Sequence, residues 1–175
     1  MESTTATTEQ GREAGSLSEP TVCAAFQATA AEHGDRTAIR TKGDEFSITW
    51  AEYADRVRRL AAGLAGIGLS SGDMIALMLT NRPEFHLADA AAMHLGAIPF
   101  SIYNTYSPEE IDYLVSDAEN RIVVTEEAFL DKVLDAQKRN NAMEHVICVD
   151  GGGDGTLSIE EVVERGDGGF DFDAA

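Results

Sequence analysis

Short apolar runs and amphipathic segments alternate between residues 74 and 149, and this alternation limits the fold more than any other feature of the chain. Two apolar runs, 74–79 (MIALML) and 97–102 (AIPFSI), have the length of buried strands. Between them, Pro83 suits the first turn of a helix and Gly96 suits its end. Four apolar residues recur at helical spacing on that helix: Phe85, Ala88, Ala92 and Leu95. This order predicts a βαβ unit of a parallel sheet.

The same alternation continues along the chain. Residues 121–125 (RIVVT) and 146–150 (VICVD) predict two more strands, with a helix over 126–139 between them. Strands that alternate with helices favour a parallel, doubly wound sheet with flanking helices. In such α/β folds, ligands bind beyond the carboxyl ends of the strands, and the polar turn at 102–107 is predicted to lie at such an end.

The flanking segments set the expected domain boundaries. Residues 1–18 are polar and without hydrophobic period, which predicts a disordered lead-in. A single α/β subdomain is expected over 19–165, and an acidic, flexible tail over 166–175. Within the subdomain, 21–33 predicts a helix that precedes the sheet, and the segment 37–49 predicts a β-hairpin.

Three helix starts carry the capping-box pattern, in which a Ser or Thr is followed three residues later by Glu. The pairs are Thr49 with Glu52, Ser107 with Glu110, and Ser158 with Glu161. An apolar residue precedes each box and another follows it, as in a hydrophobic staple. These three boundaries are the most strongly specified in the sequence.

Charge and cysteine usage exclude several classes of function. The chain holds 31 acidic and 13 basic residues, a net charge of −18, which disfavours binding to nucleic acid or to an anionic membrane. Cys23 and Cys148 lie far apart in apolar segments and predict buried thiols rather than a metal site. The polar start lacks the pattern of a signal peptide, and no stretch has the length of a transmembrane helix. We therefore expect a cytoplasmic protein.

The residues alone do not assemble a catalytic constellation. The glycine clusters at 63–68, 151–155 and 166–169 include none that joins a strand to a helix start and is followed by a lysine, so no phosphate loop is predicted. His86 and His94 are eight residues apart on one helix, too far for a chelating pair. The arginines at 56, 58 and 59 are interpreted as a solvated helix face.

One stretch has the spacing of a calcium loop. Asp150, Asp154 and Glu161 fall at the first, fifth and twelfth positions of an EF-hand loop. Gly152 stands where a third ligand is needed, and a predicted strand precedes the loop where an EF-hand has a helix. Glu161 is also accounted for by its capping box. Calcium binding is therefore considered and rejected, and no metal site is predicted.

The run from Ile48 to Glu127 resembles the N-terminal part of the adenylate-forming (AMP-binding) enzymes. The resemblance rests on the order of several motifs, namely the TW helix start, GDMIALML, NRPEF, LGAIP and SIYNTYSPE. The last of these is most similar to the long-chain fatty acyl-CoA synthetase branch. The resemblance implies that the chain is an incomplete N-terminal portion of the adenylate-forming enzyme fold.

The resemblance also implies a reaction class. Such a fatty-acid–CoA ligase joins a carboxylic acid to the α-phosphate of ATP, releases pyrophosphate and passes the acyl group to coenzyme A. The complete enzyme would use ATP with magnesium, because the metal offsets charge on the reacting phosphates. Its phosphate loop, ribose-binding aspartate and catalytic lysine are expected beyond Ala175, so no catalytic residue is assigned and this piece alone is expected to be inactive.

Only one segment is matched to a site of the family. Tyr103, Asn104, Thr105 and Tyr106 correspond to residues that border the coenzyme A channel, although a plain structural turn explains them equally well. Two further readings stay open. The piece is either a partner of a separately encoded C-terminal remainder or a non-catalytic interaction module, whose uncovered apolar sheet edges would promote oligomers.

Overall fold

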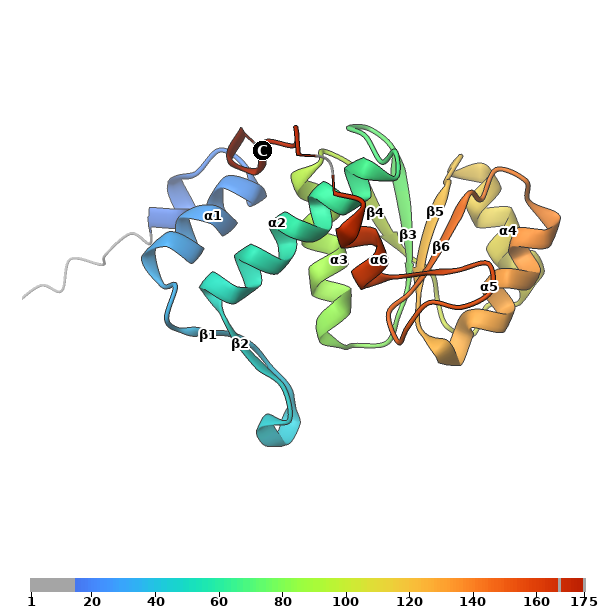
Figure 1. Cartoon of the computed structure of the whole chain (residues 1–175), viewed down its shortest axis with the longest axis horizontal. Helices are drawn as coiled ribbons and strands as arrows, with labels where there is room; N and C mark the ends of the chain where they lie inside the picture. Colours follow the sequence, from blue (N-terminus) through green and yellow to red (C-terminus); the bar gives the residue numbers. More distant parts are fainter. Residues whose placement is uncertain (1–14, 167, 175) are drawn as a thin grey trace, which may run out of the picture.

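The computed structural model describes residues 15–166 and 168–174. Its centre is a five-stranded parallel sheet with helices on both faces, and a two-stranded antiparallel hairpin projects from one side (Figure 1). This architecture confirms the predicted α/β class. Most of the predicted lead-in lies outside the described residues, and its end, Gly15–Ser18, forms a short 3-10 turn, η1.

The sheet has the strand order β4-β3-β5-β6-β7. All four neighbouring pairs are parallel. The strands are β3 (Met74–Met78), β4 (Ile98–Ser101), β5 (Ile122–Thr125), β6 (His145–Cys148) and β7 (Leu157–Ser158). The first four match the predicted strands, whereas the two-residue β7 is too short to give a hydrophobic pattern and was not predicted. The chain leaves β3 towards β4 and later returns to β5, so the topological switch point lies between β3 and β5.

The strand β4 was predicted to be buried, but it is partly exposed. It lies at the edge of the sheet, and Ile98 is 51% exposed. The backbone N–H groups of Ile98 and Ile102 point to β3, where they donate to Asp73 and Leu77. Pro99 therefore faces the free edge, where its missing N–H removes a donor that another strand would need.

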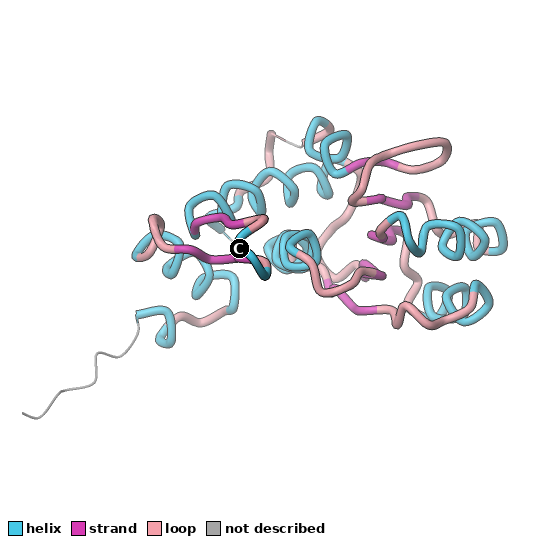
Figure 2. Tube along the Cα trace, turned by 90° about the horizontal axis from the view of Figure 1, so that it is seen from below, coloured by secondary structure: helices cyan, strands magenta, loops and turns pink. Residues whose placement is uncertain are grey.

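Helices form two layers, one on each face of the sheet (Figure 2). One layer holds α2 (Trp50–Gly66), α3 (Pro83–His94) and α6 (Ile159–Glu164), with α1 (Val22–Glu32) outside it. The other holds α4 (Pro108–Asp117) and α5 (Glu127–Arg139). Because side chains alternate along a strand, Ile75 and Leu77 pack in the first layer while Ala76 and Met78 pack in the second.

The helix α3 is buried more widely than a single apolar stripe. Its buried residues are Leu87, Ala88, Ala90, Ala91, Ala92 and His94, whereas the predicted Phe85 and Leu95 are only partly buried. It is enclosed by α2, α1 and the sheet. Four of the buried residues are alanines, whose small side chains allow these elements to approach α3 closely. The helical spacing of apolar residues alone does not predict such burial on several sides.

The three predicted capping boxes are all present and begin α2, α4 and α6. In each, the hydroxyl accepts from the backbone N–H of the glutamate, and the glutamate accepts from the backbone N–H of the capping residue. The predicted hairpin is present as β1 (Thr37–Arg40) and β2 (Ser47–Thr49), joined through the 3-10 turn η2 (Lys42–Asp44).

The end of the chain, where an acidic, flexible tail is predicted, carries two aromatic residues that pack against the fold. Phe170 and Phe172 join the main apolar core, and Phe172 is 5% exposed. The segment ends in a 3-10 turn, η3 (Phe172–Ala174), which lies beside α1 and α2 (Figure 1). The segment 168–174 is acidic, but burying the rings of Phe170 and Phe172 in a groove of the fold favours a packed position for it. Among the described residues, no helix has the length and apolar character needed to cross a membrane.

Candidate functional site

The carboxyl edge of the sheet, at the switch point between β3 and β5, carries the most connected polar cluster of the described structure. Strands β3, β5 and β6 all end there, and α3 and α5 begin there, at the lower side of Figure 1. Parallel strands deliver the residues that follow them to one edge. The loop after β3 supplies Thr80 and Arg82, the residue after β5 is Glu126, and the loop after β6 supplies Asp150.

Arg82 is the centre of this cluster. Its guanidinium forms a bidentate pair with Asp150, with Nη2 2.8 Å from Oδ1 and Nη1 3.1 Å from Oδ2. Its Nε lies 2.7 Å from Glu84 Oε2. Paired N–H donors and carboxylate oxygens make this the strong form of an ion pair. The loop after β3 is thus tied to the loop after β6.

Glu126 ties the remaining loop to the cluster. Its Oε2 accepts hydrogen bonds from the backbone N–H and the hydroxyl of Thr80, at 3.0 and 2.9 Å. The same oxygen lies 3.7 Å from Nη1 of Arg82. Asp150 also accepts from the backbone N–H of Glu127, the first residue of α5. Three loops and two helix starts are therefore joined by one hydrogen-bonded cluster.

The electrostatics of the cluster favour its charged form. The hydrogen bonds from Arg82 and from the N–H of Glu127 hold the pKa of Asp150 below its usual value. Hydrogen bonds to Asp150 and Glu84 raise the pKa of Arg82. The guanidinium is therefore already neutralised by carboxylates. This arrangement positions loops, and it does not offer a free cation to a phosphate group.

The predicted turn Tyr103–Tyr106 lies at the same edge, after β4. Tyr103 is 72% exposed and its ring meets that of Tyr106 edge to face, with 5.6 Å between centroids. The carbonyl of Asn104 accepts a hydrogen bond from Lys132 Nζ of α5 at 3.0 Å. The turn is thus fixed to the helix layer while one aromatic ring stays accessible.

The three carboxylates considered for calcium have different surroundings. Asp150 is engaged by Arg82, Glu161 caps α6 through the N–H of Ser158, and Asp154 lies in the exposed glycine loop. No group of three His, Cys, Asp or Glu side chains within residues 15–166 and 168–174 could hold a metal ion. A cavity of about 250 Å³ beside Asp150 is lined by this loop and by Glu127.

The pairing of Arg82 with Asp150 was not predicted, because 68 residues separate the two. A usable signal was present, since Arg82 follows one predicted strand and Asp150 ends another strand of the same parallel sheet. The α2 face that carries Arg56 and Arg58 was predicted to be solvated, but both guanidinium groups contact aromatic rings. Arg56 lies over the ring of Phe46 and Arg58 over the ring of Phe172, with 5.5 and 5.0 Å from guanidinium carbon to centroid.

Comparison with known proteins identifies the family. The model of the AMP-binding enzyme family matches residues 26–168, and the chain therefore belongs to this family. The uncharacterized protein Rv1549 of Mycobacterium tuberculosis is 44% identical over 131 residues, which is 75% of this chain and 73% of that protein. The 4-coumarate–CoA ligase 3 of Oryza sativa is 33% identical over 133 residues, 76% of this chain but only 24% of the ligase.

Solved structures agree on the fold. A long-chain-fatty-acid–CoA ligase from Archaeoglobus fulgidus superposes with a TM-score of 0.74 at 22% identity, over 83% of this chain and 30% of the ligase. An anthranilate CoA ligase solved with anthranoyl-AMP gives a TM-score of 0.72 at 19% identity, over 81% of this chain and 26% of that one. The described fold is thus the N-terminal portion of adenylate-forming enzymes. The relatives include ligases of aromatic acids and do not single out the long-chain branch.

Proposed function

We propose that this chain supplies the N-terminal α/β portion of a fatty-acid–CoA ligase, and that acyl-adenylate and acyl-CoA formation needs polypeptide beyond these 175 residues. The observation that carries the proposal is the family match over residues 26–168 combined with the 24% share of a CoA ligase that the chain spans. ATP, magnesium and coenzyme A are the cofactors implied for the complete enzyme. The cytoplasmic location of this chain stays a prediction.

The chemistry of the carboxyl edge supports the dependence on further polypeptide. Transfer at the α-phosphate of ATP requires donors and cations aimed at developing negative charge. At this edge Arg82 is engaged by Glu84 and Asp150, and the nearby glycine loop carries further aspartate. The cluster instead fixes the geometry of one wall, onto which catalytic groups from elsewhere could be set.

The turn Tyr103–Tyr106 supports a role next to the coenzyme A channel. It lies at a strand's carboxyl end, is fixed by Lys132 and presents the exposed ring of Tyr103. The SIYNTYSPE motif that contains this turn favours a fatty acid over an aromatic acid as the substrate of the complete enzyme. Both assignments belong to the proposal.

The test is acid-dependent exchange of pyrophosphate into ATP. The purified chain with magnesium, ATP and a fatty acid is expected to show no exchange above background. The chain produced together with the C-terminal remainder of a long-chain ligase is expected to show exchange with palmitate and little with 4-coumarate. Turnover by the 175-residue chain alone would overthrow the proposal that further polypeptide is needed. A preference for 4-coumarate over palmitate would overthrow the proposed fatty-acid substrate.

A second candidate, a non-catalytic interaction module, draws on the exposed side chains of the β4–α4 side. Ile98, Tyr103 and Tyr113 are 51%, 72% and 69% exposed. Pro99 opposes pairing with an added strand at this edge, so contact there would be made through side chains. Sedimentation decides between the readings, since a monodisperse monomer at high concentration counts against self-association.

A further inference from the structure

The segment 168–174, termed the strap, crosses back over the first helix layer after α6. Its anchor is Phe172, whose carbonyl accepts a hydrogen bond from Gln27 Nε2 of α1 at 2.6 Å. Arg58 of α2 lies over the ring of Phe172 and 3.7 Å from the carboxylate of Asp173. The strap is thus attached through the buried ring of Phe172, the partly buried ring of Phe170 and polar contacts to α1 and α2.

The ring of Phe172 rests on a buried histidine. It stacks on His94 with 4.4 Å between centroids and 8° between planes. Phe26 of α1 meets the same imidazole edge to face at 5.1 Å. His94 is only 4% exposed. Closure of the strap therefore encloses a titratable ring between aromatic side chains.

The hydrogen bonds of His94 suit its neutral form. Nδ1 lies 2.7 Å from the carbonyl oxygen of Ala90, so the proton of the neutral ring belongs on Nδ1. Nε2 is buried and has no hydrogen-bond partner among the described residues. A second proton would go to Nε2, where no acceptor receives it. An unpaired buried charge is strongly disfavoured.

The charged neighbours do not compensate for such a charge. Arg58 already lies over the ring on which His94 stacks, so protonation would place two cations on one phenyl ring. Asp173 is engaged by Arg58. The titratable and charged groups on the elements around His94 are Cys23 and Glu32 on α1, Glu52, Tyr53, Asp55, Arg56, Arg58 and Arg59 on α2, Glu84, His86 and Asp89 on α3, and Asp171 and Asp173 on the strap. Within the described structure, none of these carboxylates forms an ion pair with His94.

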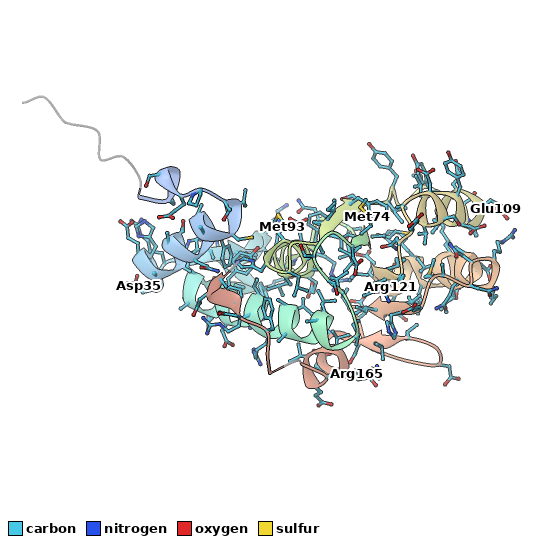
Figure 3. The ribbon with its side chains drawn as sticks, turned by 90° about the horizontal axis from the view of Figure 1, so that it is seen from above. Asp35, Met74, Met93, Glu109, Arg121 and Arg165 are labelled. Carbon is cyan, nitrogen blue, oxygen red and sulfur yellow. The ribbon has the colours of Figure 1, made fainter. Side chains whose placement is uncertain are left out.

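We propose that residues 168–174 form a pH-dependent strap, which is closed while His94 is neutral and released when its Nε2 is protonated. Release exposes the aromatic groove between α1 and α3. With the strap closed, a cavity of about 420 Å³ already lies beside it, lined by Cys23, His94, Asp171 and Met93, the last of which is labelled in Figure 3. The inference is independent of the ligase proposal.

The direction of the pH effect follows from burial. Burial lowers the pKa of His94 in the closed state, whereas an exposed histidine titrates near 6.5. Closure is therefore fully favoured above about pH 6.5. As the pH falls below that value, the closed-to-open ratio drops by about tenfold per pH unit until His94 titrates in the closed state as well.

The experiment is NMR of the whole chain between pH 8 and pH 5. Heteronuclear NOE values of the strap amides are expected to be high at pH 8 and to fall at low pH, while those of β5 stay unchanged. In the His94→Phe variant, which keeps an aromatic stack without a titrating group, the strap is expected to stay closed throughout. In Phe172→Ala it is expected to be open at every pH.

Linkage supplies a second readout that does not depend on the folding of His94→Phe. Because closure lowers the pKa of His94, opening the strap with Phe172→Ala must raise that pKa towards 6.5. The signal of the His94 ring proton against pH measures this shift, and His145, which lies on β6 rather than beside the strap, serves as the internal control. Strap NOE values that do not change with pH, or a His94 pKa unaltered in Phe172→Ala, would overturn the proposal.

Discussion

Replacing Arg82 by methionine removes the centre of the cluster at the carboxyl edge while keeping an unbranched apolar stem. The change leaves Asp150, Glu84 and Glu126 facing one another without a cation. The side chain of Glu126 is 9% exposed, and that of Arg82 is 25% exposed. The three loops that Arg82 joins lose their common partner.

The size of the effect follows from burial. Removing one partner of a fully buried ion pair costs about 3 to 5 kcal/mol, and exposed pairs are worth about 0.2 to 1 kcal/mol. The cluster lies between these limits, so Arg82→Met is expected to lower the free energy of unfolding by about 2 to 3 kcal/mol. With an m-value of about 2 kcal/mol per M, the urea midpoint falls by about 1 to 1.5 M.

The matched control is Arg139→Met. Arg139 pairs with Glu109 at 2.6 Å, shorter than any contact of Arg82, but the two side chains are 51% and 60% exposed. This variant is expected to lose less than about 1 kcal/mol. Urea unfolding followed by circular dichroism compares the two. Equal losses would contradict the reasoning, because burial rather than distance is claimed to set the cost.

The effect of Arg82→Met should also depend on pH. Pairing with Arg82 keeps the pKa of Asp150 below its ordinary value of 3.8 in the folded chain. A lowered carboxylate pKa stabilises the fold above the unfolded-state value, and this contribution is lost as the pH falls through the folded-state value. The difference between wild type and variant is therefore expected to be full at pH 7 and to shrink below pH 3.8.

Three further substitutions, the first with a matched control, test packing, helix capping and backbone geometry by thermal unfolding. Gly63→Ala would place a Cβ 2.4 Å from the carbonyl oxygen of Val162 and is expected to cost about 1 to 3 kcal/mol, while Gly153→Ala, with 3.9 Å to its nearest atom, should change little. Ser107→Ala removes the cap of α4 and is expected to cost about 1 kcal/mol; an unchanged melting temperature would speak against the cap. Glu119, at φ +49°, is strained, so Glu119→Gly is expected to stabilise by up to about 1 kcal/mol, and a loss would contradict this.

The helix boundaries and the strand positions were predictable because their causes are local. The capping box of Ser107 and Glu110 needs four consecutive residues, and each predicted strand of the parallel sheet is one short, mostly apolar run. The family motifs are contiguous for the same reason. These short-range features fixed the order of elements, and the order of elements in turn constrained the sheet to be parallel.

Sequence by itself therefore determined which segments are helices and strands, that the sheet is doubly wound, and that the chain belongs with the adenylate-forming enzymes. Only the tertiary structure decided that Arg82 meets Asp150, that β4 is an edge strand and that Phe172 covers His94. These contacts join residues far apart in the chain. They depend on strand order and on which groove remains open after the helices pack, and neither is encoded in any local pattern.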